Sequence, residues 1–545
     1  MARALLDLGR GHKRHDSGVC LAELIAALSL GVDLGLGQPM EHVLRECMLA
    51  LGLGERFGLG ESERSVVYYV ALLAWVGCHA DSYEQARWFG DDICLRANVY
   101  TSDLVGLNKA RFVMRNVGAG DAPAQRARTV MEFLLSGREA METMHATHCL
   151  VAGDLARRLG LGETVWDALL QVFERWDGNG DPGLLAGSAI SLPVRLVQLA
   201  DVVEVFNRQG GIDGAVGVAR QRSGTQFDPE VVECFCDGAG ELLAPFDETT
   251  SWDAVIDARP GLRRTLSNAE LDAALEAIAN FTDLKSPYTM GHSRGVADLA
   301  AEAGQQCGLS ENDVRTLRRA GLVHDLGRLG VSNAIWDKRG PLSAVEHERV
   351  RLHAYLTERI LCASPVLTPL GALAAQHHER LDGSGYPRGL KANMLSPPAR
   401  ILAAADVYRA MIEPRPHREA RSAADATDEL LAEVRADRLD GDAVDAVLRA
   451  AGHEITSRPR RPAGLTQREV EILRLLARGL LNKQIAQRLE IAPKTVGNHI
   501  EHIYAKIGVS SRAAAGLFAT EHGLLEFGQS AGTETPVDAG LSHAR

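Results

Sequence analysis

The run His377-His378-Glu379-Arg380-Leu381-Asp382-Gly383-Ser384-Gly385-Tyr386-Pro387 combines two adjacent imidazoles with a glycine-rich turn and an aromatic side chain. A second pair, His324-Asp325, precedes it in an apolar stretch that begins at Ala320. Imidazole and carboxylate clusters are the donors that a divalent metal site requires. A bare carboxylate in such a stretch would be costly to desolvate, and a metal ion removes that cost. The residues therefore predict a metal centre.

The pattern around these residues is helical. Apolar side chains recur at helical spacing, as at Leu271, Leu275, Ile278 and Phe281, and alternating β-branched runs are few. The sequence therefore predicts an all-α fold. At 545 residues the chain is too long for one core, and roughly three or four domains are expected.

Composition narrows the setting of the protein. The chain has 46% apolar and 24% charged residues, which is typical of soluble globular proteins. It has no run of about 18 apolar residues, and its N-terminus does not resemble a secretory signal. The nine cysteines are scattered without a C-x-x-C pair. We therefore expect a cytoplasmic protein with reduced thiols and no membrane partner.

The first half of the chain carries a degenerate copy of the second. Glu174 and Asp201 are 27 residues apart, as are Glu379 and Asp406, and 32 residues separate His42 from Ala74, as they separate His292 from His324. Such matched spacings indicate two copies of one helical unit, with about 45 extra residues in the first. In the first copy, Ala74 and Trp75 replace His324 and Asp325, Val172 and Phe173 replace the paired histidines, and Asp181 replaces Tyr386. We therefore interpret residues 15–250 as a catalytically inactive structural or sensory repeat.

The second copy resembles the HD-GYP family of metal-dependent phosphohydrolases over about residues 280–450. The resemblance implies two divalent ions, of iron, manganese or a similar metal, with Asp325 bridging them. It implies these ligands: His292, His324, Asp325, His353, His377, His378 and Asp406. Each histidine taken alone is more often a satisfied core residue, but the joint pattern and the complete Gly-Tyr-Pro turn favour the metal site.

The resemblance also implies the residues that contact substrate. Asp325 and Arg328 are the expected catalytic residues, and the expected substrate-binding residues are Arg328, Tyr386, Arg415 and Arg418. The sequence departs from the family in three places. Arg328 replaces a usual Lys, Arg409 replaces a usual Asp, and Tyr288 stands where members with three metal ions carry a Glu ligand. The Tyr288 position favours two ions over three, and a solvated charge run remains the alternative for Arg415 and Arg418.

The C-terminal end differs from the rest in charge. Residues 458–512 contain eleven Lys or Arg and four Asp or Glu, against a net charge of −12 for the whole chain. A basic end on an acidic protein indicates a nucleic-acid partner for that end. The proline- and arginine-rich stretch at 454–463 is expected to be a linker, and residues 527–545 a disordered tail.

Residues 464–526 resemble the LuxR-type helix-turn-helix. Thr466 and Glu469 form a capping-box pattern, Gly479 suits a helix end, and Pro493 suits a first helical turn. The helix after Pro493 pairs an apolar face, Val496, Ile500 and Ile503, with polar side chains suited to a DNA groove. The expected DNA-binding residues are Lys483, Lys494, Thr495, Asn498, His499 and Lys506.

These expectations combine into one architecture and one function. We expect two HD-type helical bundles, at 15–250 and 265–453, followed by a four-helix DNA-binding domain. The resemblance implies a cyclic di-GMP phosphodiesterase coupled to transcription, which would act as a homodimer because such DNA-binding modules pair on half-sites. Two alternatives remain: a regulator that senses a nucleotide without turnover, and a phosphohydrolase that acts on another nucleotide.

Overall fold

A computed structural model describes residues 18–100, 103, 105–244, 251–261, 264–454, 462–522 and 524–525. These residues form helices joined by loops, with isolated β-bridges but no strand among them, so the all-α prediction is confirmed. None of the described helices is both long enough and apolar enough to cross a membrane. The chain divides into two compact units, residues 1–455 and 456–545. The division lies within the predicted linker 454–463; most of that linker and the whole predicted tail 527–545 lie outside the described residues.

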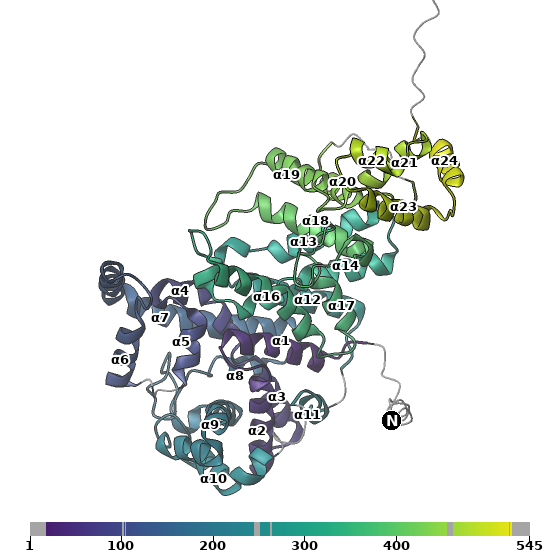
Figure 1. Ribbon diagram of the computed structural model, residues 1–545. Helices are drawn as coiled ribbons and strands as arrows, with labels where there is room; N and C mark the ends of the chain where they lie inside the picture. Colours follow the sequence, from purple (N-terminus) through teal and green to yellow (C-terminus); the bar gives the residue numbers. More distant parts are fainter. Residues whose placement is uncertain are drawn as a thin grey trace, which may run out of the picture. The chain divides into compact units, whose positions relative to one another are not determined.

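The N-terminal part of the first unit is a bundle of long and short helices (Figure 1). They are α1 (Leu21–Gly35), α2 (His42–Arg56), α3 (Glu61–Leu73), η1 (Val76–His79), α4 (Ser82–Phe89), α5 (Asp92–Val99), α6 (Gly106–Asn116), α7 (Pro123–Arg158), α8 (Glu163–Leu169), η2 (Gly187–Ala189), α9 (Leu192–Gln221), α10 (Pro229–Leu243) and α11 (Ser251–Ala258). Helix α9 is interrupted at Gly210 and Gly211, whose backbone angles are not helical. Helices α4, α5, α6 and the start of α7 share a small apolar cluster that includes Trp88, Phe89 and Phe133.

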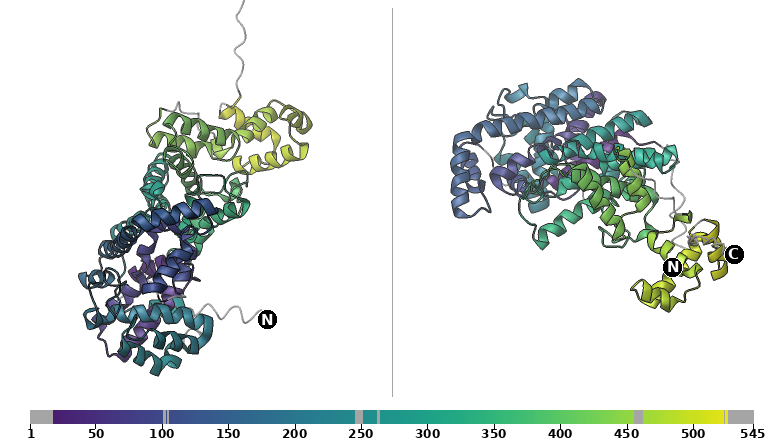
Figure 2. Two further views of the ribbon diagram at one scale, coloured as in Figure 1. Left: turned by 90° about the vertical axis from the view of Figure 1, so that its left-hand side faces the viewer. Right: turned by 90° about the horizontal axis from the view of Figure 1, so that it is seen from above.

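The second part of this unit is a further set of helices, which the sequence predicts to repeat the first. They are α12 (Asn268–Asp283), η4 (Pro287–Thr289), α13 (His292–Gln306), α14 (Glu311–Val323), η5 (Leu326–Gly330), α15 (Asn333–Trp336), α16 (Ala344–Leu361), α17 (Thr368–Ala374), η6 (Ala392–Met394), α18 (Pro397–Ile412), α19 (Ala423–Arg435) and α20 (Gly441–Ala450). The bundle is seen from two further sides in Figure 2.

Paired features support the proposed repeat. Helices α2 and α13 both have 15 residues, and α3 and α14 both have 13. The residue before α2, Glu41, and the residue before α13, Gly291, both adopt the left-handed conformation, with φ of 78° and 76°. Because a non-glycine residue rarely adopts positive φ, its retention at Glu41 indicates that both helices start with the same backbone turn.

The two repeats share one continuous apolar core. Helix α1 of the first repeat packs against η5 and α16 of the second. A Cβ atom at Gly31 in α1 would lie 3.2 Å from Leu329 and 3.3 Å from Ile360, so the helices meet closely at this glycine. The first repeat therefore supports the segment that follows Asp325.

The second unit is a small helical domain with its own core. Its helices are η7 (Pro462–Gly464), α21 (Gln467–Ala477), α22 (Asn482–Arg488), α23 (Pro493–Ile507) and α24 (Arg512–Glu521). The predicted capping box is present, because Thr466 and Glu469 exchange hydrogen bonds of 2.7 and 3.2 Å. Gly479 follows α21 with φ of 91°, and Pro493 opens α23 as predicted. Val496 and Ile503 are buried, whereas Ile500 is half-buried.

Candidate metal centre

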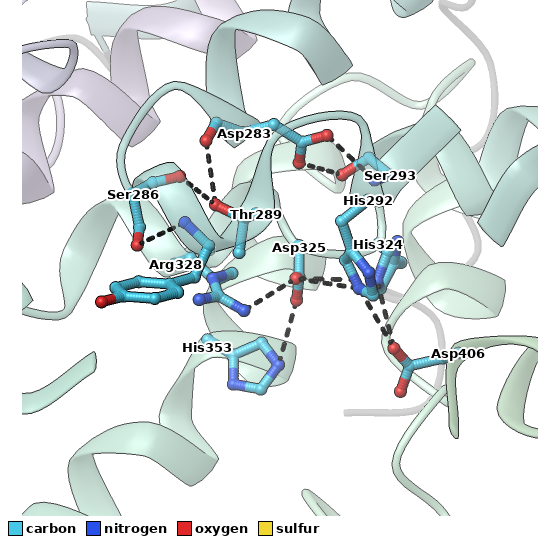
Figure 3. A network of polar contacts seen from close by, with 12 residues as sticks. Asp283, Ser286, Thr289, His292, Ser293, His324, Asp325, Arg328, His353 and Asp406 are labelled. Carbon is cyan, nitrogen blue, oxygen red and sulfur yellow. Dashed lines mark hydrogen bonds and ion pairs between the residues drawn. The ribbon is translucent and has the colours of Figure 1, made fainter. Parts of the chain in front are cut away.

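Five helices of the second repeat bring the seven predicted ligands together. His292 opens α13, His324 and Asp325 follow α14, and His353 lies on α16. His377 and His378 follow α17, and Asp406 lies on α18. All are buried except His378, which is half-buried. Figure 3 shows His292, His324, Asp325, His353 and Asp406 gathered around one point, with only His324 and Asp325 adjacent in sequence.

Asp325 faces both halves of the group. Its Oδ1 atom lies 3.4 Å from His353 Nε2 and 3.8 Å from His377 Nε2. Its Oδ2 atom lies 3.7 Å from His324 Nε2 and 3.9 Å from His292 Nε2. One carboxylate thus presents a different oxygen to each pair of imidazoles, which is the geometry that a bridging ligand needs.

Asp406 completes the group from the other side. Its Oδ1 atom lies 3.3 Å from His292 Nε2 and 3.7 Å from His324 Nε2, and its Oδ2 atom lies 3.7 Å from His378 Nδ1. The donor atoms form three overlapping sets, each with its atoms within 4.8 Å of one another. The sets are His353–His377–His378, His292–His324–Asp406 and His324–Asp325–His377.

The outward nitrogens of four imidazoles are held by hydrogen bonds. His324 Nδ1 lies 2.7 Å from Gly321 O, His353 Nδ1 lies 2.5 Å from Val350 O, and His377 Nδ1 lies 2.7 Å from Ala374 O. His292 Nδ1 lies 2.8 Å from Glu413 Oε2. Since a carbonyl only accepts, the first three rings carry their proton on Nδ1. Their Nε2 lone pairs therefore point into the site, as metal-binding histidines require.

The pKa values of Asp325, His377 and His378 are all lowered, for different physical reasons. Burial alone would raise the pKa of Asp325, but His324, Arg328 and His353 hold it well below its ordinary value. Burial lowers the pKa of His377 to about 3 and places that of His378 well below its ordinary value. Ionised carboxylates beside neutral imidazoles at His377 and His378 are the protonation states that bind a metal ion. At His292, burial alone would lower the pKa, but Asp406 and Glu413 raise it to about 9, so a metal ion would displace a proton there.

The residues present fit divalent metal ions. His324 Nε2 is buried and has no hydrogen-bond partner, and the Nε2 atoms of His353 and His377 face each other at 3.0 Å. Two buried nitrogen atoms whose lone pairs point at one another are unfavourable unless a cation or a proton lies between them. The mixture of imidazole and carboxylate suits several first-row metals and does not select one.

The glycine-rich turn is shaped by close approach to the histidines. Gly383 has φ of 83°. A Cβ atom at Gly385 would lie 2.5 Å from His378 O and 2.4 Å from Arg380 N, so only glycine fits there. Tyr386 then packs its ring against His378, with centroids 4.6 Å apart. The turn therefore places Tyr386 on the wall of the site, beside the inner histidines.

The three predicted arginines are placed differently. Arg328 donates to Asp325 Oδ2 at 3.1 Å and lies over the Trp336 ring at 3.8 Å. Arg415 donates to Tyr288 O at 3.2 Å and to Glu413 Oε2 at 3.3 Å. Arg328 and Arg415 thus border the site.

Arg418 instead binds the backbone at the end of α18. Its guanidinium donates to the carbonyl oxygens of Met411 and Glu413 at 3.0 and 3.2 Å, and to those of Glu419 and Ala410. These bonds close the turn after α18, and the role of Arg418 in substrate contact stays a prediction.

Two residues of the site are not indicated by the sequence pattern. Glu413 accepts from His292 and also pairs with Arg409 at 2.8 Å. Position 409 carries Arg and not the acid usual in the family, so the acceptor for His292 is instead Glu413, seven residues after Asp406. Trp336, which stacks on Arg328, also has an edge contact with His353. For Glu413 the only signal in the sequence is its position two residues before Arg415. For Trp336 the sequence gives no signal.

Most of the predicted DNA-binding residues lie on the surface of the second unit. Lys483 on α22 and Lys494, Thr495 and Asn498 on α23 are exposed, whereas His499 is half-buried. Lys506 donates to Glu469 Oε2 at 2.6 Å and to Gly464 O at 3.3 Å. Lys506 therefore also ties α23 to the start of α21.

Comparisons with known proteins agree with this geometry. The HD domain family model matches residues 276–443, and the model of the bacterial regulatory proteins of the luxR family matches residues 463–519. The 3′3′-cGAMP-specific phosphodiesterase 3 of Vibrio cholerae is 34% identical over 405 residues, which cover 73% of this chain and 88% of that protein. The cyclic di-GMP phosphodiesterase of Thermotoga maritima is 34% identical over 158 residues, 29% of this chain and 43% of that protein.

A solved structure extends the likeness to the fold. A crystal structure of a cyclic GMP-AMP-specific phosphodiesterase of Vibrio cholerae aligns with a TM-score of 0.56 and 29% identity, covering 80% of this chain and 99% of that one. The bundle and its cluster of histidines and aspartates define a metal-dependent phosphohydrolase of the HD type. The chain belongs to the HD domain phosphohydrolases related to the HD-GYP cyclic dinucleotide phosphodiesterases, and it carries a C-terminal LuxR-type helix-turn-helix domain. The family resemblance is therefore confirmed.

Proposed function

We propose that this protein is a phosphodiesterase that opens a 3′,3′-cyclic dinucleotide to its linear form, with 3′3′-cGAMP as its preferred substrate. The observation that carries the proposal is the Asp325 carboxylate, which presents one oxygen to each half of a group of buried imidazoles. The preference for 3′3′-cGAMP is supported by the relative of that specificity, which aligns over both repeats of this chain.

Two divalent ions fit the donor sets on either side of Asp325. His292, His324 and Asp406 would hold one, and His353, His377 and His378 the other. Bound there, such ions supply positive charge beside a phosphodiester and lower the pKa of water toward neutrality.

The surrounding side chains would position the substrate. Arg328 is fixed by Asp325 and by the Trp336 ring, so its planar guanidinium is ready to bind a phosphate through two parallel bonds. Arg415 borders the same site through Tyr288 and Glu413. Tyr386 offers a half-buried aromatic face beside His378 on which a base could stack.

Cyclic di-GMP is the second candidate substrate. The Thermotoga maritima relative of that specificity aligns only with a shorter segment of the chain. It therefore supports the chemistry of the site more than the choice of base. Sensing without turnover is the second candidate function. Arg409 pairs with Glu413, the acceptor of His292, and thereby adds a positive charge near the site where the family usually has an acid.

Hydrolysis assays on the full-length protein separate these functions. We expect linear product from 3′3′-cGAMP in the presence of Mn²⁺ or Fe²⁺, with a higher kcat/KM than for cyclic di-GMP. His324→Ala removes a donor from two of the three sets and should abolish turnover. His347→Ala, an exposed histidine on the same helix as His353, should not. Tight binding without product would support the sensing function, and equal turnover by His324→Ala would contradict the proposed site.

We further propose that nucleotide occupancy changes DNA binding by the helix-turn-helix domain. Both activities reside in one chain, and the basic face of α23 is exposed. Titrating duplex DNA with the His324→Ala variant, with and without 3′3′-cGAMP at a concentration at which calorimetry shows the variant to be saturated, measures the coupling without hydrolysis. A difference in DNA affinity supports the coupling, and identical affinities contradict it. The homodimer stays a prediction, which the mass of the DNA complex in solution would test.

A further inference from the structure

We propose that the first repeat holds a single divalent metal ion on His42, Glu46 and Asp201. One donor atom from each lies within 4.8 Å of the others, and all three side chains are buried. The same geometric arrangement recurs in the described part of the chain only in the three sets of the catalytic repeat. The repeat that lost the paired histidines therefore retains a compact set of one imidazole and two carboxylates.

Two of the three donors occupy positions that match metal ligands of the second repeat. His42 and Asp201 correspond to His292 and Asp406. His42 Nε2 lies 3.1 Å from Asp201 Oδ1, compared with 3.3 Å for the catalytic pair. Two metal–ligand bonds of about 2.1 Å readily span such a separation.

The third donor is new to this repeat. Glu46 lies four residues after His42 on α2, so both side chains point from the same face of the helix. The catalytic repeat has Val296 at the matching position. Trp75, which replaces the bridging Asp325, donates its indole N–H to both Glu46 oxygens at 3.2 and 3.0 Å. The indole thus holds the carboxylate that compensates for the lost His324.

The outward side of His42 is built like that of a metal ligand. His42 Nδ1 lies 2.5 Å from Glu204 Oε2, as His292 Nδ1 lies 2.8 Å from Glu413. Arg45 and Arg208 pair with Glu204 at 2.6 and 2.9 Å, so the charge of Glu204 is compensated from outside. Glu46 and Asp201 are left as two buried carboxylates beside one imidazole, a set that a divalent cation would balance.

A cavity adjoins one of the three proposed ligands. A space of about 290 Å³ is lined by Asp201, Trp75 and Tyr100, among other residues. Tyr100 also donates its hydroxyl to Asp201 Oδ1 at 3.0 Å. Of the three proposed ligands only Asp201 lines this cavity, so the cavity reaches the site at that carboxylate. Nitrogen and oxygen donors of this kind suit Mn²⁺, Fe²⁺ or Zn²⁺.

The test counts metal in a full-length protein whose catalytic donor sets are broken. His324→Ala with His377→Ala removes at least one donor from each of the three catalytic sets. After loading with Mn²⁺ and gel filtration, elemental analysis should find about one Mn²⁺ per chain. Adding Glu46→Gln, which preserves an acceptor for Trp75, should weaken Mn²⁺ binding at least tenfold. Glu55→Gln, an exposed acid on the same helix, is the matched control and should leave binding unchanged.

A second measurement needs no change in the first repeat. Co²⁺ added to the double histidine variant should produce visible absorption bands and quench part of the tryptophan fluorescence, because Trp75 contacts Glu46. No bound Mn²⁺ and no Co²⁺ bands in that variant would overturn the proposal. His42 would then be an imidazolium held between Glu204 and Asp201. That outcome would not bear on the proposed phosphodiesterase activity, which the hydrolysis assays test separately.

Discussion

The Nε2 atoms of His353 and His377 lie 3.0 Å apart, and each ring donates its Nδ1 proton to the backbone carbonyl three residues earlier. Both inner nitrogens therefore carry lone pairs, which repel each other unless a positive charge lies between them. Burial lowers the pKa of both rings, so a proton is not held there near neutral pH. A bound metal ion is the remaining way to satisfy the pair.

Metal removal should therefore destabilise the first unit. A ligand present at about 100 times its Kd stabilises the folded state by about 2.7 kcal/mol, so chelation by EDTA should lower the Tm of the Mn²⁺-loaded protein by several degrees. Differential scanning calorimetry measures this shift. The variant with His324→Ala and His377→Ala should show a smaller shift, and an equal one would place the stabilising ion elsewhere.

Glu413 should tune metal affinity although it is not in the ligand set. Its carboxylate accepts from His292 at 2.8 Å, and acceptors of this kind typically change metal affinity by about 10- to 100-fold. We expect Glu413→Ala to weaken Mn²⁺ binding by that factor in isothermal titration. The exposed Glu419 on the same turn is the matched control. Unchanged affinity in Glu413→Ala would show that the acceptor does not orient His292.

Arg328 should not be replaceable by lysine. Its guanidinium stacks on Trp336 at 3.8 Å while it binds Asp325, and an ammonium group offers neither a planar face nor two parallel bonds. We expect Arg328→Lys to lower kcat/KM for 3′3′-cGAMP about tenfold, which corresponds to about 1.4 kcal/mol. Arg349→Lys, at an exposed position on α16, should have no effect. Full activity of Arg328→Lys would indicate a point-charge role instead.

Asp92 should link the stability of the two repeats to pH. From α5 of the first repeat it accepts from Ser332 at 2.7 Å and from Asn333 N at 2.8 Å, and it pairs with Lys285 at 3.4 Å. Burial alone would raise the pKa of Asp92, but Lys285 and Arg96 outweigh it and lower the pKa from 3.8 to about 2. The ionised form is thus favoured in the folded state.

A depressed carboxylate pKa stabilises the fold above the unfolded value of 3.8, and this contribution is lost as the pH falls through about 2. We expect Asp92→Asn to reduce the free energy of unfolding by about 2 kcal/mol at pH 7. Urea unfolding should show the difference from wild type shrinking between pH 4 and pH 2. A difference independent of pH would mean that Asp92 acts through hydrogen bonds alone.

Much of the catalytic site follows from spacing along the chain. His324 and Asp325, the paired histidines and the glycine-rich turn predict a shared metal site, and the structure brings them together. The acceptors for His324, His353 and His377 are carbonyls three residues earlier, which helix geometry supplies locally. Glu413 could not be found in this way, because its contact with His292 depends on the course of the chain after α18.

In the first repeat, a comparison with the ligand positions of the second repeat does not find every possible metal ligand. Comparing matched positions finds His42, Asp201 and His148, which corresponds to His353, and these three predict no dinuclear centre. Glu46 escapes that comparison because its partner position holds Val296. Its spacing from His42 is helical, but the approach of both side chains to Asp201 becomes visible only when α2 and α9 pack. At Arg418 the motif position predicts substrate contact, and the structure adds bonds to the backbone that close a turn; the substrate contact stays a prediction.

The two lysines of α23 should respond differently to substitution. Lys494 is exposed near the start of the helix, where a phosphate contact is expected, whereas Lys506 pairs with the buried Glu469 at 2.6 Å. Lys494→Met should leave the Tm unchanged and reduce the salt slope of duplex DNA binding by about one. Lys506→Met leaves the Glu469 carboxylate with only its capping contacts, so it should destabilise the second unit by about 1–3 kcal/mol. Thermal melts and DNA titrations at several salt concentrations, carried out on both variants, separate the two roles. A normal Tm combined with a reduced salt slope for Lys506→Met would instead assign Lys506 to the DNA interface.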